Sequence, residues 1–471
     1  MFSFRLAERK TLLVVIDLII VELTTVLAFW IMAFRAGWVF DLEYLVDQAG
    51  WFIFLPALWF FSALITGFYD PQKITDLSTA IGALVRAVAF VVIVYVVIYF
   101  FFATPGTLPR GIVGYQGVAS FILIGLWRLA YVQVIQRPVF ARKIIIVGAG
   151  WAGETIAQTI QDYASIHYRI LGFIDDDPNK IGQCVRLEES KVDFPILGTA
   201  RDLVRIVQEQ NIPEVILAIS HETRPLLFRA LLECKERGIQ VTLMSELFEQ
   251  LTGRIPIEHI GDYWNIALPL DSAEASGFYP AAKRVFDITS ASVGLVLYAL
   301  IFPFIAIAIR VDSRGPIFYS QERVGKGGRV FQLLKLRTMV ANAEADGQAV
   351  RAQERDPRIT RVGGLLRKAR LDEMPQLLNV LKGDMSAVGP RPERPEHLAE
   401  LDRVIPFHRL RNSVKPGMAG WAVVNHGYVE SVDDAKIRLQ YDLYYIKHQS
   451  LWLDLIILLR TMGDMLALRG R

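Results

Sequence analysis

The sequence predicts a membrane protein in three parts: four N-terminal transmembrane helices, a Rossmann-like α/β domain, and a C-terminal part that enters the bilayer through a re-entrant helix. Three observations predict this. Hydrophobic residues fill 53% of the 471 positions while charged residues still fill 21%, a balance that suits a membrane part joined to water-soluble parts. Four long apolar stretches precede residue 140, and alternating strand and helix patterns follow. A fifth apolar stretch has basic residues at both ends.

The four N-terminal stretches each have close to the ~20 residues that a helix needs to cross a bilayer. Their expected limits are Thr11–Phe34, Trp51–Phe68, Gly82–Phe102 and Gln116–Val134. Four crossings return the chain to its starting side. Three charged residues lie within these spans, where they either serve a function or face one another: Asp17, Glu22 and Arg128.

The basic residues that flank the spans fall mostly on one side. That side carries Arg5, Arg9, Lys10, Lys73, Arg86, Arg137, Arg142 and Lys143, against Arg35 and Arg110 on the other. The positive-inside bias therefore puts the N-terminus and everything after residue 135 in the cytoplasm.

After Arg142, short apolar strands alternate with amphipathic helices, which predicts a parallel, doubly wound sheet. The expected strands are Lys143–Val147, Tyr168–Ile174, Glu214–Ile219 and Gln240–Met244. The expected helices are Ala152–Asp162, Ala200–Gln210 and Arg224–Arg237. The domains then run over residues 1–140 (transmembrane), 141–255 (α/β), 256–282 (a linker without clear periodicity) and 283–471.

A glycine motif opens the α/β domain. Gly148, Gly150 and Gly153 follow the first strand and begin a helix, and Asp175 ends the next strand. This context lets a backbone approach a pyrophosphate while the acid holds a ribose. A nucleotide bound in this middle domain and a fold that keeps the turn without a ligand are equally weighted alternatives.

The fifth apolar stretch, Val285–Ile309, should not cross the membrane. Basic residues precede and follow it, and both groups favour the cytoplasmic side. A hairpin that enters and leaves the same face satisfies both ends, and Pro303 supplies the membrane bend because proline interrupts helical hydrogen bonding. A kinked true span is the alternative.

The apolar segment Leu451–Leu459 is too short to cross, and it either lies on the membrane or is buried in the domain core.

Composition excludes several functions. A formal charge of +3 gives no field that would favour nucleic acid. Cys184 and Cys234 lack the number and spacing of a zinc site or a disulfide framework. Tyr279 and Lys283 form a YxxxK pair, but Pro280 lies between them where a dehydrogenase would need a helix.

The densest chemical signal lies between residues 314 and 420, where basic residues alternate with glycines. Arginine and lysine beside glycine turns suit phosphate oxygens, although a basic face on anionic lipid is the alternative for any one of them. Asp372 and Glu373 precede Pro375 and an apolar run, so Asp372 is expected at the start of a short helix. An N-cap aspartate is the plain alternative for it.

At this point the residues resemble a known family. Arg367 to Glu373, followed by Met-Pro-Gln-Leu-Leu-Asn-Val-Leu-Lys-Gly-Asp-Met-Ser-Ala-Val-Gly-Pro-Arg-Pro, resembles the motif of bacterial sugar transferases, the polyprenyl-phosphate hexose-1-phosphate transferases that start exopolysaccharide or O-antigen units. The likeness covers about Lys283 to the C-terminus, and the whole chain resembles the long, multi-domain members. It implies a monotopic, mainly α catalytic domain in the bacterial inner membrane, facing the cytoplasm.

The resemblance also implies roles for residues. Asp372 is the expected nucleophile and Glu373 its partner in metal binding or proton handling, and both are the expected ligands of a Mg²⁺ ion. Three residues are expected to bind substrate phosphate: Lys335, Arg337 and Arg367. The nucleotide is expected at Gly389, Pro390, Arg391 and Pro392. Two positions depart from the family pattern: Arg370 replaces a common serine, and Phe302 replaces a small hydroxyl residue before Pro303.

The activity that the resemblance implies is transfer of a hexose 1-phosphate from a UDP-sugar to undecaprenyl phosphate, with release of UMP and a covalent aspartyl-phosphosugar intermediate. UDP-glucose and UDP-galactose are the first donors to consider. The alternatives are a membrane-bound nucleotide-sugar sensor or scaffold and a nucleotide-sugar dehydratase. The sequence leaves open the hexose, the pathway and a homodimer.

Overall fold

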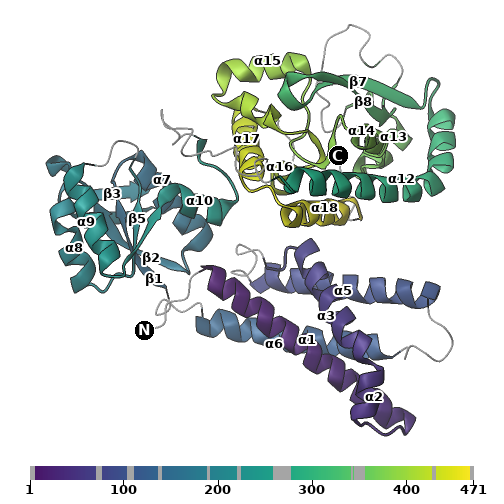
Figure 1. The fold of residues 1–471 in the computed structure, drawn as a ribbon, viewed down its shortest axis with the longest axis horizontal. Coiled ribbons are helices and arrows are strands. Elements are labelled where there is room, and N and C mark those ends of the chain that lie inside the picture. The colour runs from purple at the N-terminus through teal and green to yellow at the C-terminus, as the bar shows by residue number, and fades with distance from the viewer. Residues whose placement is uncertain are drawn as a thin grey trace. The chain divides into compact units, whose positions relative to one another are not determined.

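The computed structural model describes residues 6–69, 77–102, 111–135, 141–187, 191–219, 224–257, 277–340, 343, 356–426 and 431–466. It divides into two compact units, Met1–Thr252 and Gly253–Arg471, whose helices and strands are drawn in Figure 1. Each unit has its own hydrophobic cores. The first unit holds the N-terminal helices and the α/β sheet. The second holds the Asp372–Glu373 pair.

The predicted spans are helices. They are α1 (Leu6–Ala36), α3 (Ala49–Ile65), α5 (Leu77–Phe102) and α6 (Ile112–Ile135). By length and apolar composition α1, α5 and α6 can cross a bilayer, while α3 is shorter, with 17 residues. The short helix α2 (Leu42–Asp47) was not predicted. Large apolar side chains such as Val21, Trp59 and Ile124 fill the core between the four long helices.

Two of the charged residues within the spans form a buried ion pair. Arg128 Nη2 lies 2.7 Å from Asp17 Oδ2, and both side chains are almost fully buried. The Arg128 guanidinium also lies 4.3 Å from the centroid of the Phe68 ring. For these two residues the expectation that charges within the spans face one another is confirmed. Glu22 is different, because its buried Oε2 has no hydrogen-bond partner among the residues that the structure describes.

The α/β domain is a six-stranded sheet in the order β3-β4-β2-β1-β5-β6. Its strands are β1 (Arg142–Val147), β2 (Tyr168–Ile174), β3 (Cys184–Leu187), β4 (Val192–Gly198), β5 (Glu214–Leu217) and β6 (Gln240–Leu243). All neighbours pair in parallel except β3, the antiparallel edge strand. The predicted doubly wound sheet is confirmed.

Helices cover both faces of this sheet. Helices α7 (Trp151–Ala164) and α10 (Met244–Thr252) pack on one face, and α8 (Ala200–Glu209) and α9 (Pro225–Glu236) on the other (Figure 1). The sequence analysis missed β3, β4 and α10. Strand β3 forms the sheet edge and β4 lies next to it, and in both strands polar residues or Pro195 interrupt the apolar pattern.

The second unit is mainly helical, with two small sheets. An antiparallel hairpin joins β7 (Phe318–Val324) to β8 (Val330–Leu336), and β9 (Ser386–Val388) pairs in parallel with β10 (Gly417–Ala419). Its longer helices are α12 (Tyr279–Asp312), α13 (Arg361–Lys368), α14 (Gln376–Lys382), α15 (Pro395–Val404), α17 (Val432–Lys447) and α18 (Leu451–Leu466). The predicted linker ends too late, because α12 already begins at Tyr279; residues 258–276 lie outside the described part.

Both ends of helix α12 are hydrogen-bonded to other segments of the second unit. Near its start, Arg284 Nη1 donates to the Val380 carbonyl at 2.7 Å. At its end, Asp312 Oδ2 accepts from the Val362 amide at 2.9 Å, and Arg337 Nη2 donates to the Ser313 carbonyl at 2.7 Å. A straight crossing would place the two ends on opposite sides of the bilayer, so these contacts support entry and exit on one face.

Between these anchors α12 exposes a long apolar surface. It consists of Val285, Ile288, Val293, Val296, Leu297, Leu300, Ile301, Phe304, Ile307 and Val311. Pro303 lies inside the helix, which continues through it, and Figure 1 shows α12 change direction before it leads into β7. Phe302 stacks on Phe318, with ring centroids 5.6 Å apart, so this bulky residue packs against the hairpin. The bend within a membrane stays a prediction.

Helix α18 is longer than the predicted Leu451–Leu459 segment, and it is amphipathic. Asp454 and Ile457 are fully buried, whereas Trp452 and Met462 are about half exposed. The buried face packs in the domain core, and the apolar side chains of the other face are of the kind that suits a lipid surface.

The Asp17–Arg128 pair gives a testable prediction for the membrane helices. Asp17→Leu should lower the free energy of unfolding by about 3–5 kcal/mol, because it leaves the buried Arg128 charge without its partner. The double variant Asp17→Leu/Arg128→Leu should regain most of that loss. Thermal or chemical unfolding of purified protein in detergent measures both. A single variant as stable as the wild type would show that the pair contributes nothing.

Candidate active site

The two carboxylates lie in a short turn of their own. Asp372 and Glu373 belong to the 3₁₀ turn Leu371–Glu373 between α13 and α14, and Arg370 enters it with φ +54°. The prediction that Asp372 begins the following helix is wrong, because α14 starts at Gln376. Pro375 has no amide hydrogen to continue the turn, so the helix begins only after it. The charge of Asp372 must therefore be balanced by side chains rather than by a helix dipole.

Glu373 is buried and bound by two cations. Its Oε1 accepts from Lys335 Nζ at 2.8 Å and from Arg391 Nη2 at 2.5 Å, and its Oε2 accepts from Arg391 Nη1 at 3.2 Å. Burial alone would raise the pKa of Glu373, but the charges and hydrogen bonds of Arg391 and Lys335 hold it well below its ordinary value. Glu373 is thus a fixed anion.

Asp372 has a different environment. It is also buried, but no hydrogen bond or ion pair joins its carboxylate to any residue in the described ranges. Burial and the negative charge of Glu373 raise the pKa of Asp372 to about 6, against the opposing charges of Lys335 and Arg367. Without donors on them, the oxygens of the Asp372 carboxylate keep their lone pairs available.

The basic residues predicted to bind phosphate separate into two groups. Lys335, near the end of β8, lies at the carboxylate pair, and Arg367 on α13 is close enough for its charge to act on Asp372. Arg367 Nε donates to Thr338 Oγ1 at 2.9 Å, which fixes the guanidinium. Arg337 instead bonds the end of α12, so its position favours an anchoring role over a phosphate contact.

The loop at Gly389–Pro392 is held close to the site by backbone packing. A Cβ on Gly389 would lie 2.5 Å from the Lys415 carbonyl oxygen and 2.9 Å from the Gly417 amide nitrogen, so only glycine fits there. The Arg391 carbonyl accepts from Arg411 Nη2 at 2.9 Å, while its guanidinium reaches Glu373. Arg391, predicted to meet the nucleotide, is therefore part of the carboxylate site.

A buried ionic cluster behind this loop was missed. Glu393 Oε1 accepts from Arg438 Nη1 at 2.6 Å and lies 3.6 Å from Arg411 Nη1, and Arg411 also bonds Asp442 at 2.8 Å. Burial opposes ionisation, but Arg438, Arg411 and Arg323 lower the pKa of Glu393 to about 2. The run Arg391-Pro-Glu393-Arg signals charge, but only the fold brings residues 411 and 438 beside it.

Tyr298 is a second residue that sequence reasoning missed. It is buried on α12, its hydroxyl has no hydrogen-bond partner in the described part of the chain, and the charge of Asp372 acts on it. The only sequence signal was a tyrosine within an apolar stretch. Its position connects the membrane helix to the carboxylate pair.

The glycine motif of the α/β domain uses its acid internally. Asp175 Oδ2 accepts from the Ala149 amide at 2.8 Å and from Lys180 Nζ at 3.2 Å. Gly148 has φ +107° and Gly153 approaches the Gly148 carbonyl too closely for any side chain, as a tight turn before a helix requires. Because Asp175 holds the turn itself, these contacts favour a glycine turn kept without a ribose.

The carboxylate pair suits a divalent cation of the hard type. Mg²⁺ is usually bound through one or two carboxylates, with substrate phosphates and water completing the shell. Asp372 offers oxygens that no described donor occupies, and Glu373 lies next to it. The described residues hold no group of three or more His, Cys, Asp or Glu arranged as metal ligands. A metal here would therefore depend on substrate phosphate oxygens.

These features define a class of protein: a membrane enzyme whose C-terminal domain places a buried carboxylate pair and clustered cations beside a long apolar helix. Residues 278–467 match the bacterial sugar transferase family, and residues 64–245 match a family described as a CoA-binding domain. The chain belongs to the bacterial sugar transferase family.

Three relatives illustrate the likeness. The chain is 34% identical over 431 residues to UDP-N-acetylgalactosamine-undecaprenyl-phosphate N-acetylgalactosaminephosphotransferase of Aeromonas hydrophila, covering 87% of this chain and 94% of the relative. A UDP-glucose:undecaprenyl-phosphate glucose-1-phosphate transferase of Escherichia coli K12 is 28% identical, over 71% of this chain and 74% of its own. A transferase of the same name from Caulobacter vibrioides is 45% identical, and the match covers 39% of the length of this chain and 69% of the length of that relative.

The Glu393 cluster gives a prediction for the catalytic domain. Because its folded-state pKa of about 2 lies below the ordinary value, ionised Glu393 stabilises the fold above about pH 4.3 and this is lost as the pH falls toward 2. Glu393→Gln should cost roughly 3 kcal/mol at pH 7 and much less at pH 3. Unfolding in detergent at both pH values measures this.

The exposed variant Asp433→Asn is the matched control and should change stability by no more than about 0.5 kcal/mol. An equal loss for Glu393→Gln at both pH values would contradict the assigned ionic role.

Proposed function

We propose that the protein transfers a hexose 1-phosphate from a UDP-sugar to undecaprenyl phosphate, with release of UMP, as the first membrane step of exopolysaccharide or O-antigen synthesis. The observation that carries the proposal is Asp372: a buried carboxylate free of hydrogen-bond donors in the described structure, surrounded by Lys335, Arg367 and Arg391. The undecaprenyl-phosphate sugar-phosphate transferases among the relatives support it.

The proposed reaction has two displacements at one phosphorus. Asp372 Oδ attacks the sugar-linked phosphorus of the UDP-sugar, a bond forms between oxygen and phosphorus, and the pyrophosphate bond breaks so that UMP leaves with the electron pair. A phosphate oxygen of undecaprenyl phosphate then attacks the same phosphorus and releases Asp372. The attack uses the ionised form of Asp372, so no separate base has to remove a proton.

The neighbouring residues divide the remaining work. Lys335 and Arg391 hold Glu373 as an anion and add positive charge near the phosphates, and Arg367 extends it toward Asp372. Asp372 and Glu373 are the residues that would hold Mg²⁺, which when bound neutralises phosphate charge. The loop at Gly389–Pro392 is rigidly held beside them and is the proposed nucleotide contact.

The donor sugar is proposed as glucose or galactose. One relative is named for N-acetylgalactosamine and another for glucose, two sugars that differ in the configuration at carbon 4 and in the substituent at carbon 2. An experiment must therefore decide both features of the donor sugar. A panel of UDP-glucose, UDP-galactose and their N-acetyl forms, scored for UMP release with undecaprenyl phosphate and Mg²⁺, identifies the donor.

The central prediction concerns the nucleophile. Asp372→Asn should lower UMP release by at least about 10³-fold, because an amide is a poor nucleophile at phosphorus, while the protein still folds. With wild type and radiolabelled donor, but without acceptor, label should become attached to the protein. Asp433→Asn, an exposed acid of the same domain, should keep full activity. Release of UDP instead of UMP, or full activity of Asp372→Asn, would reject the covalent mechanism.

The proposed orientation in the inner membrane has its own test. Cys184 is exposed in the α/β domain, and Glu400→Cys in a Cys184→Ser background reports on the catalytic domain, where Glu400 is 75% exposed. A membrane-impermeant maleimide should label both cysteines in inverted vesicles and neither in intact spheroplasts. Labelling of Glu400→Cys from outside would place the catalytic domain away from nucleotide sugars and exclude the proposed reaction.

A further inference from the structure

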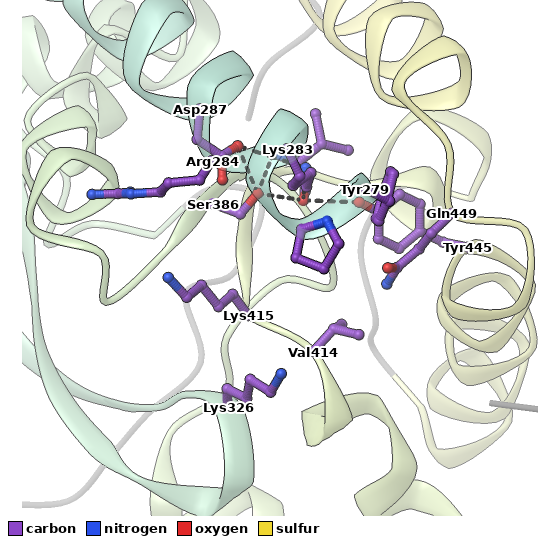
Figure 2. A pocket seen from close by; sticks show the side chains of 12 residues that line it. Tyr279, Lys283, Arg284, Asp287, Lys326, Ser386, Val414, Lys415, Tyr445 and Gln449 are labelled. Carbon is purple, nitrogen blue, oxygen red and sulfur yellow. Dashed lines mark hydrogen bonds and ion pairs between the residues drawn. The ribbon is translucent and has the colours of Figure 1, made fainter. Parts of the chain in front are cut away.

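The two cations that bind Glu373 come from two strand segments, and a helix side chain is bonded to each segment. Lys335 lies in β8, and Arg391 lies in the loop that follows β9. For β9 the helix is α12, because Asp287 Oδ1 accepts from Ser386 Oγ at 2.9 Å, as Figure 2 shows. For β8 the helix is α14, and the contact lies directly beside Lys335.

Strand β8 has one edge without a strand partner, because its sheet in the described structure consists of β7 and β8 alone. A two-stranded hairpin is only marginally stable by itself. The N–H and C=O groups on its outer edges take their partners from side chains, other backbone or water. The position of Lys335 therefore depends on the groups that bind the open edge of β8.

Asn379 of α14 binds this open edge at two points. Its Oδ1 accepts from the Leu334 amide at 3.1 Å, and its Nδ2 donates to the Gln332 carbonyl at 2.8 Å. A side-chain amide that accepts and donates at once replaces the groups that a neighbouring strand would offer. Asn379 is only 3% exposed, so loss of its side chain would leave two backbone groups of β8 without these partners in a buried place.

One short segment, from Glu373 to Asn379, thus contacts β8 at two places. Glu373 binds Lys335, and Asn379 binds the two residues at positions 332 and 334, just before it. Residues along a strand are about 3.3 Å apart, so even a shift of β8 by a fraction of this spacing would move the Lys335 ammonium group relative to Glu373. The contacts of Asn379 oppose such a shift.

We propose that Asn379 is a positioning residue, whose side chain holds β8 so that Lys335 meets Glu373 and the phosphates of the donor. Both bonds of its side chain go to the backbone of β8, so Asn379 acts through Lys335 rather than on the substrate. The effect on catalysis rests on the proposed function, whereas the placement of Lys335 can be measured without any substrate.

The first test measures this placement in full-length protein in detergent. An amine-reactive reagent and peptide mass spectrometry report the labelling rates of Lys335 and Lys283, whose side chains are 18% and 14% exposed and both paired with acids. Asn379→Leu should raise the labelling rate of Lys335 several-fold and leave that of Lys283 unchanged. An equal rise at both lysines would show a general loosening of the domain, and no rise at Lys335 would show that Asn379 does not place it; either result overturns the proposal.

The second test is a double-mutant cycle on UMP release. Asn379→Leu should lower kcat by about 10²-fold, the loss that a misplacement of about 1 Å can cause. In a Lys335→Met background the same change should cause no further loss, because no ammonium group remains to be misplaced. Losses that multiply would show that Asn379 acts independently of Lys335 and overturn the proposal. A wild type that releases no UMP would refute the proposed function instead, and the labelling rates would still decide the role of Asn379.

Two further variants make the result specific. Asn379→Asp covers a leucine variant that fails to fold: it keeps the size and the acceptor for the Leu334 amide, cannot donate to the Gln332 carbonyl, and should give the same pattern. Thr461→Val is the matched control, because it removes a buried bond of 2.8 Å from Thr461 Oγ1 to the Ile457 carbonyl in α18. It should change neither the labelling of Lys335 nor UMP release. Effects as large as those of Asn379→Leu would contradict a specific role for Asn379.

Discussion

The buried ion cluster around Glu373 is the interaction on which the catalytic domain depends. Lys335 comes from β8, Glu373 from the turn before α14, and Arg391 from the loop after β9, so one carboxylate connects three segments far apart in sequence. Two cations on one buried acid leave a net positive charge, which suits the neighbouring Asp372 and an incoming phosphate. Removal of Glu373 would leave the buried charges of Lys335 and Arg391 without the carboxylate that pairs with both.

A second layer of charge keeps this cluster in place. Arg411 and Arg438 bond the Arg391 carbonyl while their guanidinium groups neutralise Glu393 and Asp442. The backbone of Arg391 is thus held by Arg411 and Arg438, and its side chain is held by Glu373. The position of Arg391 therefore depends on Glu393 and Asp442, which hold Arg438 and Arg411 in place but do not themselves contact the carboxylate pair.

The sequence predicted most of the fold because apolar periodicity dominates it. Strand β2 and the start of α8 agree with the expected limits, since buried strands and amphipathic helices are set by local patterns. It could not place Asp372 correctly, because the end of one turn and the start of the next helix depend on Pro375 and on the positive φ of Arg370. Nor could it separate Lys335 from Arg337, which are two residues apart in one strand pattern, and so expected on one face, yet contact different groups.

The anchoring of α12 explains why one helix serves both membrane attachment and chemistry. Near the start of α12, Arg284 donates to carbonyls at the end of α14, the helix that follows the carboxylate turn. At the other end of α12, the Ser313 carbonyl accepts from Arg337, which lies one residue after β8, the strand that carries Lys335. Movement of α12 in the bilayer would therefore act on both sides of the Lys335–Glu373 pair. Tyr298, buried between the two anchors, places its hydroxyl where the charge of Asp372 acts on it. The same helix thus carries the exposed apolar surface and supports the carboxylate turn, and in the proposed reaction this arrangement is what lets a polar donor and a lipid acceptor meet at Asp372.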